Sequence, residues 1–199
     1  MSDSVAPGII RKLWPAEASI FRDHLLRLDH ESRRNRFGSA VSEDFIEHYS
    51  ARVFRSGAVV HGGFIEGKLR AAAELYPFSE IMPNEAEAAF SVERAFQNLR
   101  LGTRLLERCI LAARNRGIRT LHMNCLAHNR RMQKMVRKFD ATLAFEVDEV
   151  MAQLKTPFPT AISLAEEASA DARGVAGTML QVQWRATGQV LDLLLPHAA

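Results

Sequence analysis

Carboxylates recur at alternate positions in one short stretch of the chain, Glu85-Ala86-Glu87-Ala88-Ala89-Phe90-Ser91-Val92-Glu93. Such alternation is typical of a β-strand, in which every second side chain lies on the same face. Glu85, Glu87, Ser91 and Glu93 therefore share one face. A carboxylate in this position can act as a general base and take a proton from an attacking amine. A solvated polar face of an ordinary strand is the structural alternative.

A glycine-containing loop follows the strand and leads into a helix, with the sequence Gln97-Asn98-Leu99-Arg100-Leu101-Gly102-Thr103. Free backbone N–H groups and the helix dipole make the start of a helix favourable for a phosphate group. Gly102 allows a ligand close to the backbone, Thr103 adds a hydroxyl group, and Arg100 adds positive charge. Strand-loop-helix units with one glycine are mostly structural, so this loop alone is weak evidence for a phosphate site.

Positive charge is concentrated in and after the helix that this loop begins. Between Asn98 and Asp140, eleven basic residues face two acidic ones, which gives +9 there and −6 elsewhere within a net charge of +3. This balance favours an anionic ligand, although a solvated basic face is equally compatible with it. Nucleic acid is disfavoured as the ligand because the stretch lacks interleaved exposed aromatic residues and any recognisable nucleic-acid-binding motif.

The composition limits the class of protein. The 199 residues, 47% of them hydrophobic, are enough for one domain with a core, or for a domain with an appendage. No apolar run approaches the roughly 20 residues of a membrane helix, and residues 1–10 do not resemble a secretory signal, so we expect a cytoplasmic protein without membrane contact. Cys109 and Cys125 are interpreted as reduced core residues, and we predict neither a metal site nor a covalent nucleophile.

The predicted elements alternate between strands and helices. We expect a strand at 9–13, helices at 15–28 and 42–50, a hairpin at 58–65 and 69–76, a strand at 85–93, a helix at 101–116, a strand at 118–126, a helix at 129–139 and two short strands within 143–155. After Pro157 the composition changes, and 160–195 is predicted to form one or two helices. Apolar residues in this tail need a partner, which suggests either the domain itself or a homodimer.

The loop and its surroundings resemble the acyl-CoA-binding motif of the GNAT N-acyltransferase superfamily, which reads Arg or Gln, two residues, Gly, one residue, Gly or Ala. Gln97 and Gly102 match its ends, while Arg100 replaces the first Gly. Asn129-Arg130-Arg131 resembles the beginning of the helix after the splayed strand. The order of elements is similar over roughly residues 8–155, about three quarters of the chain. Glu87 makes the motif most similar to bacterial protein-lysine acetyltransferases.

This resemblance implies an α/β (α+β) fold with a mixed, mostly antiparallel central sheet, splayed strands and flanking helices. Residues 1–156 would form the acyl-CoA N-acyltransferase domain and 157–199 a helical C-terminal extension. A bulge near Val92 or Glu93 would direct a backbone N–H at the thioester oxygen. The implied cofactor-binding residues are Phe90, Val92, Gln97, Asn98, Leu99, Arg100, Leu101, Gly102, Thr103 and Asn129.

The implied reaction is direct attack of a primary amine on acetyl-CoA or another short-chain acyl-CoA, without a metal. Glu87 is the first candidate for the base and Glu74 the second, while Glu93 is expected to face solvent at the loop. The family often uses a Tyr seven residues after the helix Asn to protonate the departing thiolate, and Val136 stands there. Tyr76, Ser91 or water would then replace it.

Two readings of function remain open. Arg100 and Val136 depart from the family pattern, so a catalytically weak acyl-CoA-binding regulatory module is the alternative to an N-acetyltransferase. For the enzyme, the acceptor would be a small-molecule or protein amine, and the negative charge outside the cofactor half hints at a cationic one such as a polyamine or lysine. His122 and Asn124, on one face of the splayed strand, are candidates for lining its pocket.

Overall fold

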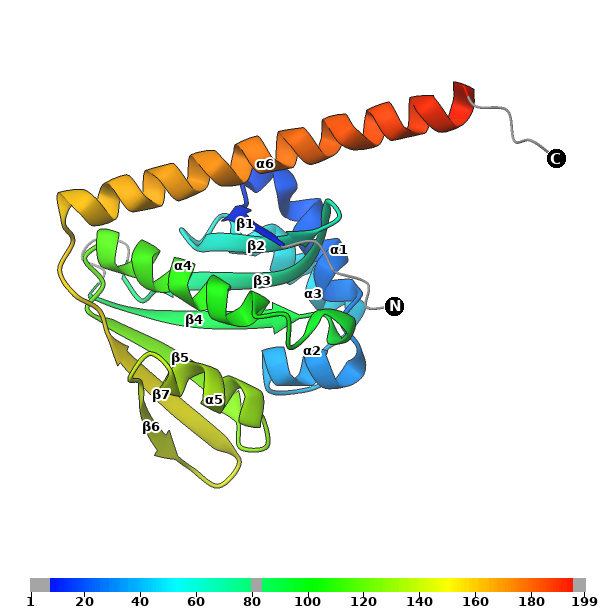
Figure 1. The fold of residues 1–199 in the computed structure, drawn as a ribbon. Coiled ribbons are helices and arrows are strands. Elements are labelled where there is room, and N and C mark those ends of the chain that lie inside the picture. Colours follow the sequence, from blue (N-terminus) through cyan, green and yellow to red (C-terminus); the bar gives the residue numbers. More distant parts are fainter. Residues whose placement is uncertain (1–7, 80–83, 195–199) are drawn as a thin grey trace.

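The computed structural model describes residues 8–79 and 84–194, with side chains described up to residue 177. A seven-stranded sheet runs through it in the order β1-β2-β3-β4-β5-β7-β6 (Figure 1). Neighbouring strands are antiparallel except β4 and β5, which are parallel. The strands are β1 (Ile9–Lys12), β2 (Val59–Ile65), β3 (Lys68–Pro77), β4 (Glu85–Val92), β5 (Thr120–Leu126), β6 (Thr142–Phe145) and β7 (Glu149–Lys155). The predicted mixed, mostly antiparallel sheet is confirmed.

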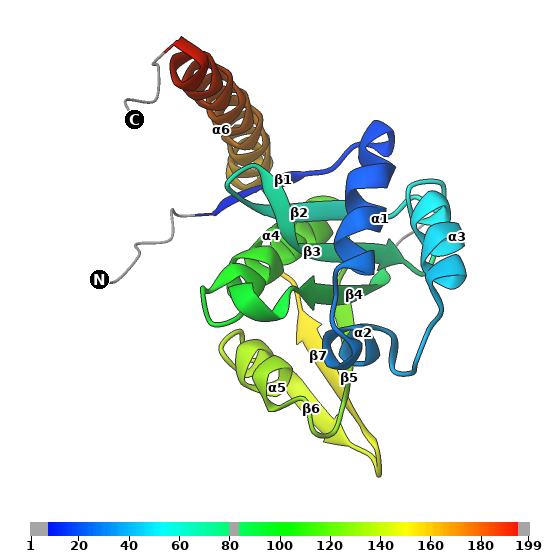
Figure 2. The ribbon, with the colours of Figure 1, turned by 90° about the vertical axis from the view of Figure 1, so that its right-hand side faces the viewer.

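Helices cover both faces of this sheet (Figures 1 and 2). One core lies between α4 and the sheet and includes Leu105, Leu106 and Leu121. A second core, with Phe21 and Ile46 at its centre, lies under α1 and α3 on the opposite face. The helices are η1 (Pro15–Glu17), α1 (Ala18–Leu26), α2 (His30–Phe37), α3 (Glu43–Val53), η2 (Arg94–Phe96), α4 (Leu101–Asn115), α5 (Arg130–Arg137) and α6 (Ala161–Leu194). None of the helices described here combines the length and apolar character of a membrane span.

Helix α2 was not predicted from the sequence. It carries no apolar stripe, and its ends are fixed by local capping instead. The Asp29 carboxylate accepts a hydrogen bond from the Ser32 backbone N–H (2.9 Å), and Gly38 ends the helix in the left-handed region at φ 74°. Three helices rather than two therefore lie between β1 and β2.

The parallel strands β4 and β5 separate soon after they meet. Their pairing covers only Glu85 to Glu87 on β4 and Thr120 to His122 on β5, whereas β5 pairs with β7 along its whole length. Beyond Glu87, one edge of β4 therefore faces a gap (Figure 2). The expected bulge does not occur between β3 and β4, because their register runs without a shift from Pro77 and Ala86 to Ala71 and Val92.

The C-terminal tail forms one helix, α6, whose first half packs against the domain and whose second half runs past it (Figure 1). Arg108 of α4 pairs with Asp171, and Arg116 pairs with Glu167 at 2.8 Å. A Cβ atom at Gly174 would lie 2.5 Å from a side chain of β1, so this glycine permits close contact with the edge strand. The division into a domain and an extension at residue 156 remains a prediction.

Candidate active site

The free edge of β4 presents backbone groups to the gap between β4 and β5. The Glu93 N–H donates to the Arg70 carbonyl (3.0 Å), and the Phe78 N–H donates to the Glu85 carbonyl (2.9 Å). Glu85 and Glu93, at the two ends of β4, therefore direct their backbone groups at β3. In an antiparallel ladder this direction alternates with each residue. Phe90 and Val92 therefore direct their N–H and C=O groups into the gap. The predicted use of these two residues through their backbones matches this orientation.

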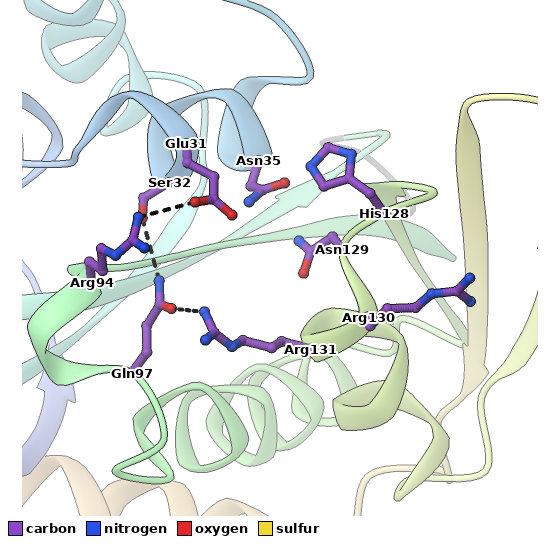
Figure 3. Close-up of a pocket in the computed structure, with 9 residues that line it drawn as sticks. All are labelled: Glu31, Ser32, Asn35, Arg94, Gln97, His128, Asn129, Arg130 and Arg131. Carbon is purple, nitrogen blue, oxygen red and sulfur yellow. Dashed lines mark hydrogen bonds and ion pairs between the residues drawn. The ribbon is translucent and has the colours of Figure 1, made fainter.

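A polar cavity of about 260 Å³ lies at one end of the gap, between α2, η2 and the start of α5 (Figure 3). Gln97 and Asn129, both predicted as cofactor-binding residues, line the same cavity. The Oδ1 atom of Asn35 on its wall is buried and accepts no hydrogen bond within the described part of the chain. The lining residues are Glu31, Ser32, Asn35, Arg94, Gln97, His128, Asn129, Arg130 and Arg131.

Two interactions reach across this cavity. Arg94 pairs with Glu31 of α2 at 3.1 Å. The Gln97 amide Nε2 donates to the Val92 carbonyl at 3.2 Å, and its Oε1 accepts a hydrogen bond from Arg131 (Figure 3). Gln97 therefore links the edge of β4 to α5. Asn129 is the N-cap of α5, where its Oδ1 accepts from the Met132 N–H at 3.1 Å.

Glu74 of β3 is fully buried and saturated with hydrogen bonds. Its Oε1 accepts from Arg36 of α2 (2.7 and 3.0 Å), and its Oε2 accepts from the hydroxyl groups of Tyr49 of α3 (2.5 Å) and Tyr76 (2.7 Å). Burial, reinforced by the Glu74 carboxylate, raises the pKa of both tyrosines. Both hydroxyl groups thus stay protonated, and both oxygens of Glu74 are occupied by hydrogen-bond donors.

A second buried network ties α1 to β4. Glu93 is only 7% exposed, so the expectation that it faces solvent is wrong. Its carboxylate meets His24 Nδ1 at 3.2 Å, Arg27 Nε at 2.9 Å and Arg70 Nη1 at 2.8 Å. Burial opposes ionisation of Glu93, but the hydrogen bonds from these three residues lower its pKa. His24 Nε2 lies 2.9 Å from Ser91 Oγ, and burial lowers the pKa of this histidine and keeps it neutral.

Glu87 differs from these carboxylates. It is half-buried and occupies the last paired position before β4 and β5 separate, with Tyr76 opposite on β3 and His122 opposite on β5. No hydrogen bond or ion pair involves the side chain of Glu87 within the residues that the structure describes, whereas the Glu85 side chain contacts His122 at 2.7 Å. His122 also stacks on Phe78. Glu87 is therefore the carboxylate on this face with capacity for a ligand.

The fold and this gap can be compared with known proteins. Residues 22–140, more than half of the chain, match the Acetyltransferase (GNAT) family. The chain belongs to this family. No match was found among curated protein sequences. The assignment supports an N-acetyltransferase that uses acyl-CoA, at the level of the family.

Solved GNAT structures resemble the chain in fold. The GNAT domain of PAT from S. lividans has 24% identity and a TM-score of 0.63, covering 73% of this chain and 89% of that one. YncA, a putative acetyltransferase from Salmonella typhimurium with acetyl-CoA as its cofactor, has 18% identity and a TM-score of 0.59, covering 77% and 96%. A cAMP-binding acyltransferase from Mycobacterium smegmatis has 19% identity and a TM-score of 0.54, covering 85% and 51%.

The GNAT motif loop has an unusual backbone. Asn98 and Arg100 adopt left-handed conformations at φ 66° and 62°. A glycine reaches this region without strain, which explains why the family has Gly where this chain has Arg100. The Arg100 side chain is exposed, whereas the Leu101 side chain is buried in the core. A Cβ atom at Gly102 would lie 3.1 Å from Met135 Sδ, so this glycine admits α5 close to α4.

Much of the basic stretch faces the tail instead of the GNAT cofactor site. Arg104 donates to the Gly8 carbonyl at 2.6 Å, and Arg108 and Arg116 pair with acids of α6. Acids of α6 therefore neutralise Arg108 and Arg116, and the interpretation of the stretch as a field for an anionic cofactor remains a prediction. Arg130 and Arg131 of the stretch do line the cavity, together with Arg94, which lies outside it.

Sequence reasoning missed several residues around the site. Arg36, Ser32 and Asn35 lie on α2, whose lack of periodicity hid the helix. His24 and Tyr49 lie within the predicted helices 15–28 and 42–50, but neither was predicted as a site residue. The Asp29 and Gly38 capping pair was the available signal for α2. Cys109 was assigned correctly to the core, where burial raises the pKa of its thiol to about 12 and leaves it protonated.

Proposed function

We propose that this chain transfers a short acyl group, in the first place acetyl, from acyl-CoA to a primary amine by direct attack. The cosubstrate supplies the activated thioester. The observation that carries the proposal is the place of Glu87, a carboxylate free of ion pairs within the described chain, where β4 and β5 diverge. Farther along the same strand, Phe90 and Val92 direct their backbone groups away from β3.

The residues of the gap fit an acyl-pantetheine arm. Outward N–H and C=O groups at Phe90 and Val92 would pair with its amides, and one such N–H would stabilise negative charge that develops on the thioester oxygen. The loop 97–103 and the first N–H groups of α4 would bind the pyrophosphate. Arg130 and Arg131 add positive charge beside Asn129 in the same cavity.

Glu87 would take the proton from the attacking amine. Glu74 and Glu93 are poorly suited to this step because cationic side chains and hydroxyl groups already occupy their oxygens. The Tyr76 hydroxyl donates a hydrogen bond to Glu74 and lies 2.6 Å from the Tyr49 hydroxyl, which leaves one lone pair of its oxygen for a further donor. We therefore assign Tyr76 to binding an amine N–H opposite Glu87. Protonation of the departing thiolate would fall to water, since a thiol of low pKa needs little assistance.

A comparison of Glu87→Gln with Glu85→Gln tests the proposal, because both carboxylates lie on the same face of β4. CoA release would be measured with acetyl-CoA and a panel of polyamines and lysine peptides, and acetyl-CoA affinity by calorimetry. We expect Glu87→Gln to lose roughly 100-fold or more in turnover with unchanged affinity. Glu85→Gln should stay within a few-fold of the parent.

Three outcomes would contradict the proposal. Binding of acetyl-CoA by the parent without turnover of any amine would indicate the alternative, a regulatory acyl-CoA-binding module. Full activity of Glu87→Gln would remove Glu87 from the proton transfer. Absence of acetyl-CoA binding at millimolar ligand would refute the use of this cosubstrate altogether.

A further inference from the structure

The side chain of Gln97 lies between β4 and α5, in the region where the acyl-CoA of the proposed function would bind. Its Nε2 donates to the outward-facing carbonyl of Val92 at 3.2 Å and lies 3.4 Å from Ser32 Oγ of α2. Its Oε1 accepts from Arg131 of α5. One carboxamide thus satisfies a backbone acceptor on β4 and a guanidinium donor on the opposite wall.

These two contacts have the same chemistry as the contacts a CoA molecule would offer. A pantetheine amide N–H is equivalent to Nε2–H as a donor to Val92, and a phosphate oxygen is equivalent to Oε1 as an acceptor from Arg131. We propose that Arg131 binds a phosphate group of the acyl-CoA, and that the Gln97 side chain occupies Arg131 and the Val92 carbonyl in the free protein until the cosubstrate displaces it. This inference rests on the proposed function.

The partner and the direction of its guanidinium group distinguish Arg131 from Arg94 and Arg130, the other arginines that line the cavity. Arg94 already has a carboxylate partner in Glu31, whereas the partner of Arg131 among the described residues is the neutral amide of Gln97. Arg130 also has a neutral partner, Gln133, but its guanidinium group points away from the loop while that of Arg131 points at Gln97 (Figure 3). Exchange of a neutral acceptor for an anionic one strengthens the hydrogen bond.

The packing of α5 places Arg131 beside the motif loop. Gly102, in the first turn of α4, lies so close to Met135 that a Cβ atom there would be 3.1 Å from its sulfur. Arg131 precedes Met135 by four residues, so both side chains lie on the same face of α5. Arg131 is therefore positioned over the N–H groups that begin α4, where the pyrophosphate would bind.

Calorimetric titration with acetyl-CoA at several salt concentrations tests this inference. The variants are Arg131→Gln, Gln97→Ala and the control Arg137→Gln, which removes an exposed arginine from the same helix, 6.0 Å from the Phe145 ring. We expect Arg131→Gln to weaken binding about tenfold and to reduce its salt dependence. Gln97→Ala should tighten binding because no internal contact has to be broken, and Arg137→Gln should bind like the parent.

Each result has a definite meaning. The inference is overturned if Arg131→Gln binds acetyl-CoA like the parent or like Arg137→Gln, if its affinity falls with the parent's salt dependence, or if Gln97→Ala binds more weakly. All of these results require a parent that binds acetyl-CoA. A parent that does not bind refutes the proposed function itself, so the two failures are distinguishable.

Discussion

His61 on β2 is expected to make the fold sensitive to mild acid. It is 1% exposed, and its Nδ1 has no hydrogen-bond partner among the described residues. Burial, with Arg108, Arg116 and Lys12 nearby, lowers its pKa from 6.5 to about 3. The folded state therefore stays unprotonated between these values while the unfolded chain takes up a proton, so stability falls as the pH drops below 6.5. At about 1.4 kcal/mol per pH unit, the loss from pH 7 to pH 5 is about 2 kcal/mol.

Urea unfolding at a series of pH values measures this loss. His61→Gln removes the titrating group. The fall in the free energy of unfolding from pH 7 to pH 5 should therefore be about 2 kcal/mol smaller in this variant than in the parent, whatever the stability of the variant at pH 7. The lowered pKa of His24 acts in the same direction, so some dependence remains in the variant. His128→Gln, which replaces an exposed histidine, is the control. Parallel curves for the parent and His61→Gln would refute the reasoning.

Two further substitutions test the geometry of the motif loop and of the tail. Arg100→Gly should raise the free energy of unfolding by about 0.5–1 kcal/mol, because glycine adopts φ 62° without the steric cost of a side chain. A lower urea midpoint for this variant than for the parent would show that the backbone at Arg100 is not strained. Gly174→Ala should lower the free energy of unfolding by about 1–3 kcal/mol, since its Cβ would lie 2.5 Å from the Arg11 Cβ and 3.0 Å from the Ile10 carbonyl oxygen. Gly177→Ala is the matched control, because the nearest atom to its Cβ is the flexible end of the Ile9 side chain. Equal losses of unfolding free energy in the two variants would show that α6 is not held at Gly174.

The sequence predicted those elements whose side chains repeat with a clear period. Helix α4 was found because Leu101, Leu105 and Cys109 recur on one stripe, and β4 because apolar and polar residues alternate. Helix α2 was missed because its stability depends on capping and on the ion pair from Arg36 to Glu74, which has a sequence separation of 38 residues. Such a contact leaves no local periodic pattern. The length of α6 was left open because its glycines weaken the helix pattern, although two of them pack against β1.

The face of each carboxylate was predictable, but its protonation chemistry was not. Alternation correctly placed Glu87 and Glu93 on one side of β4. Their difference comes from other elements, because His24 and Arg27 of α1 and Arg70 of β3 converge on Glu93. Glu87 lies nearer the other end of the strand, beyond the reach of these cations. Such convergence depends on how α1 packs on the sheet, which no local pattern in the sequence specifies.

The two departures from the GNAT pattern have different structural consequences. Arg100 adopts a left-handed backbone conformation that is unfavourable for a residue with a side chain, and that side chain is exposed. Val136 stands where the family often has a tyrosine that acts as the general acid. Its side chain is 1% exposed, in the core that packs against α4. Tyr76 and Ser91, the two side chains predicted to replace that tyrosine, are engaged with Glu74 and His24. In the proposed transfer, protonation of the departing thiolate therefore falls to water.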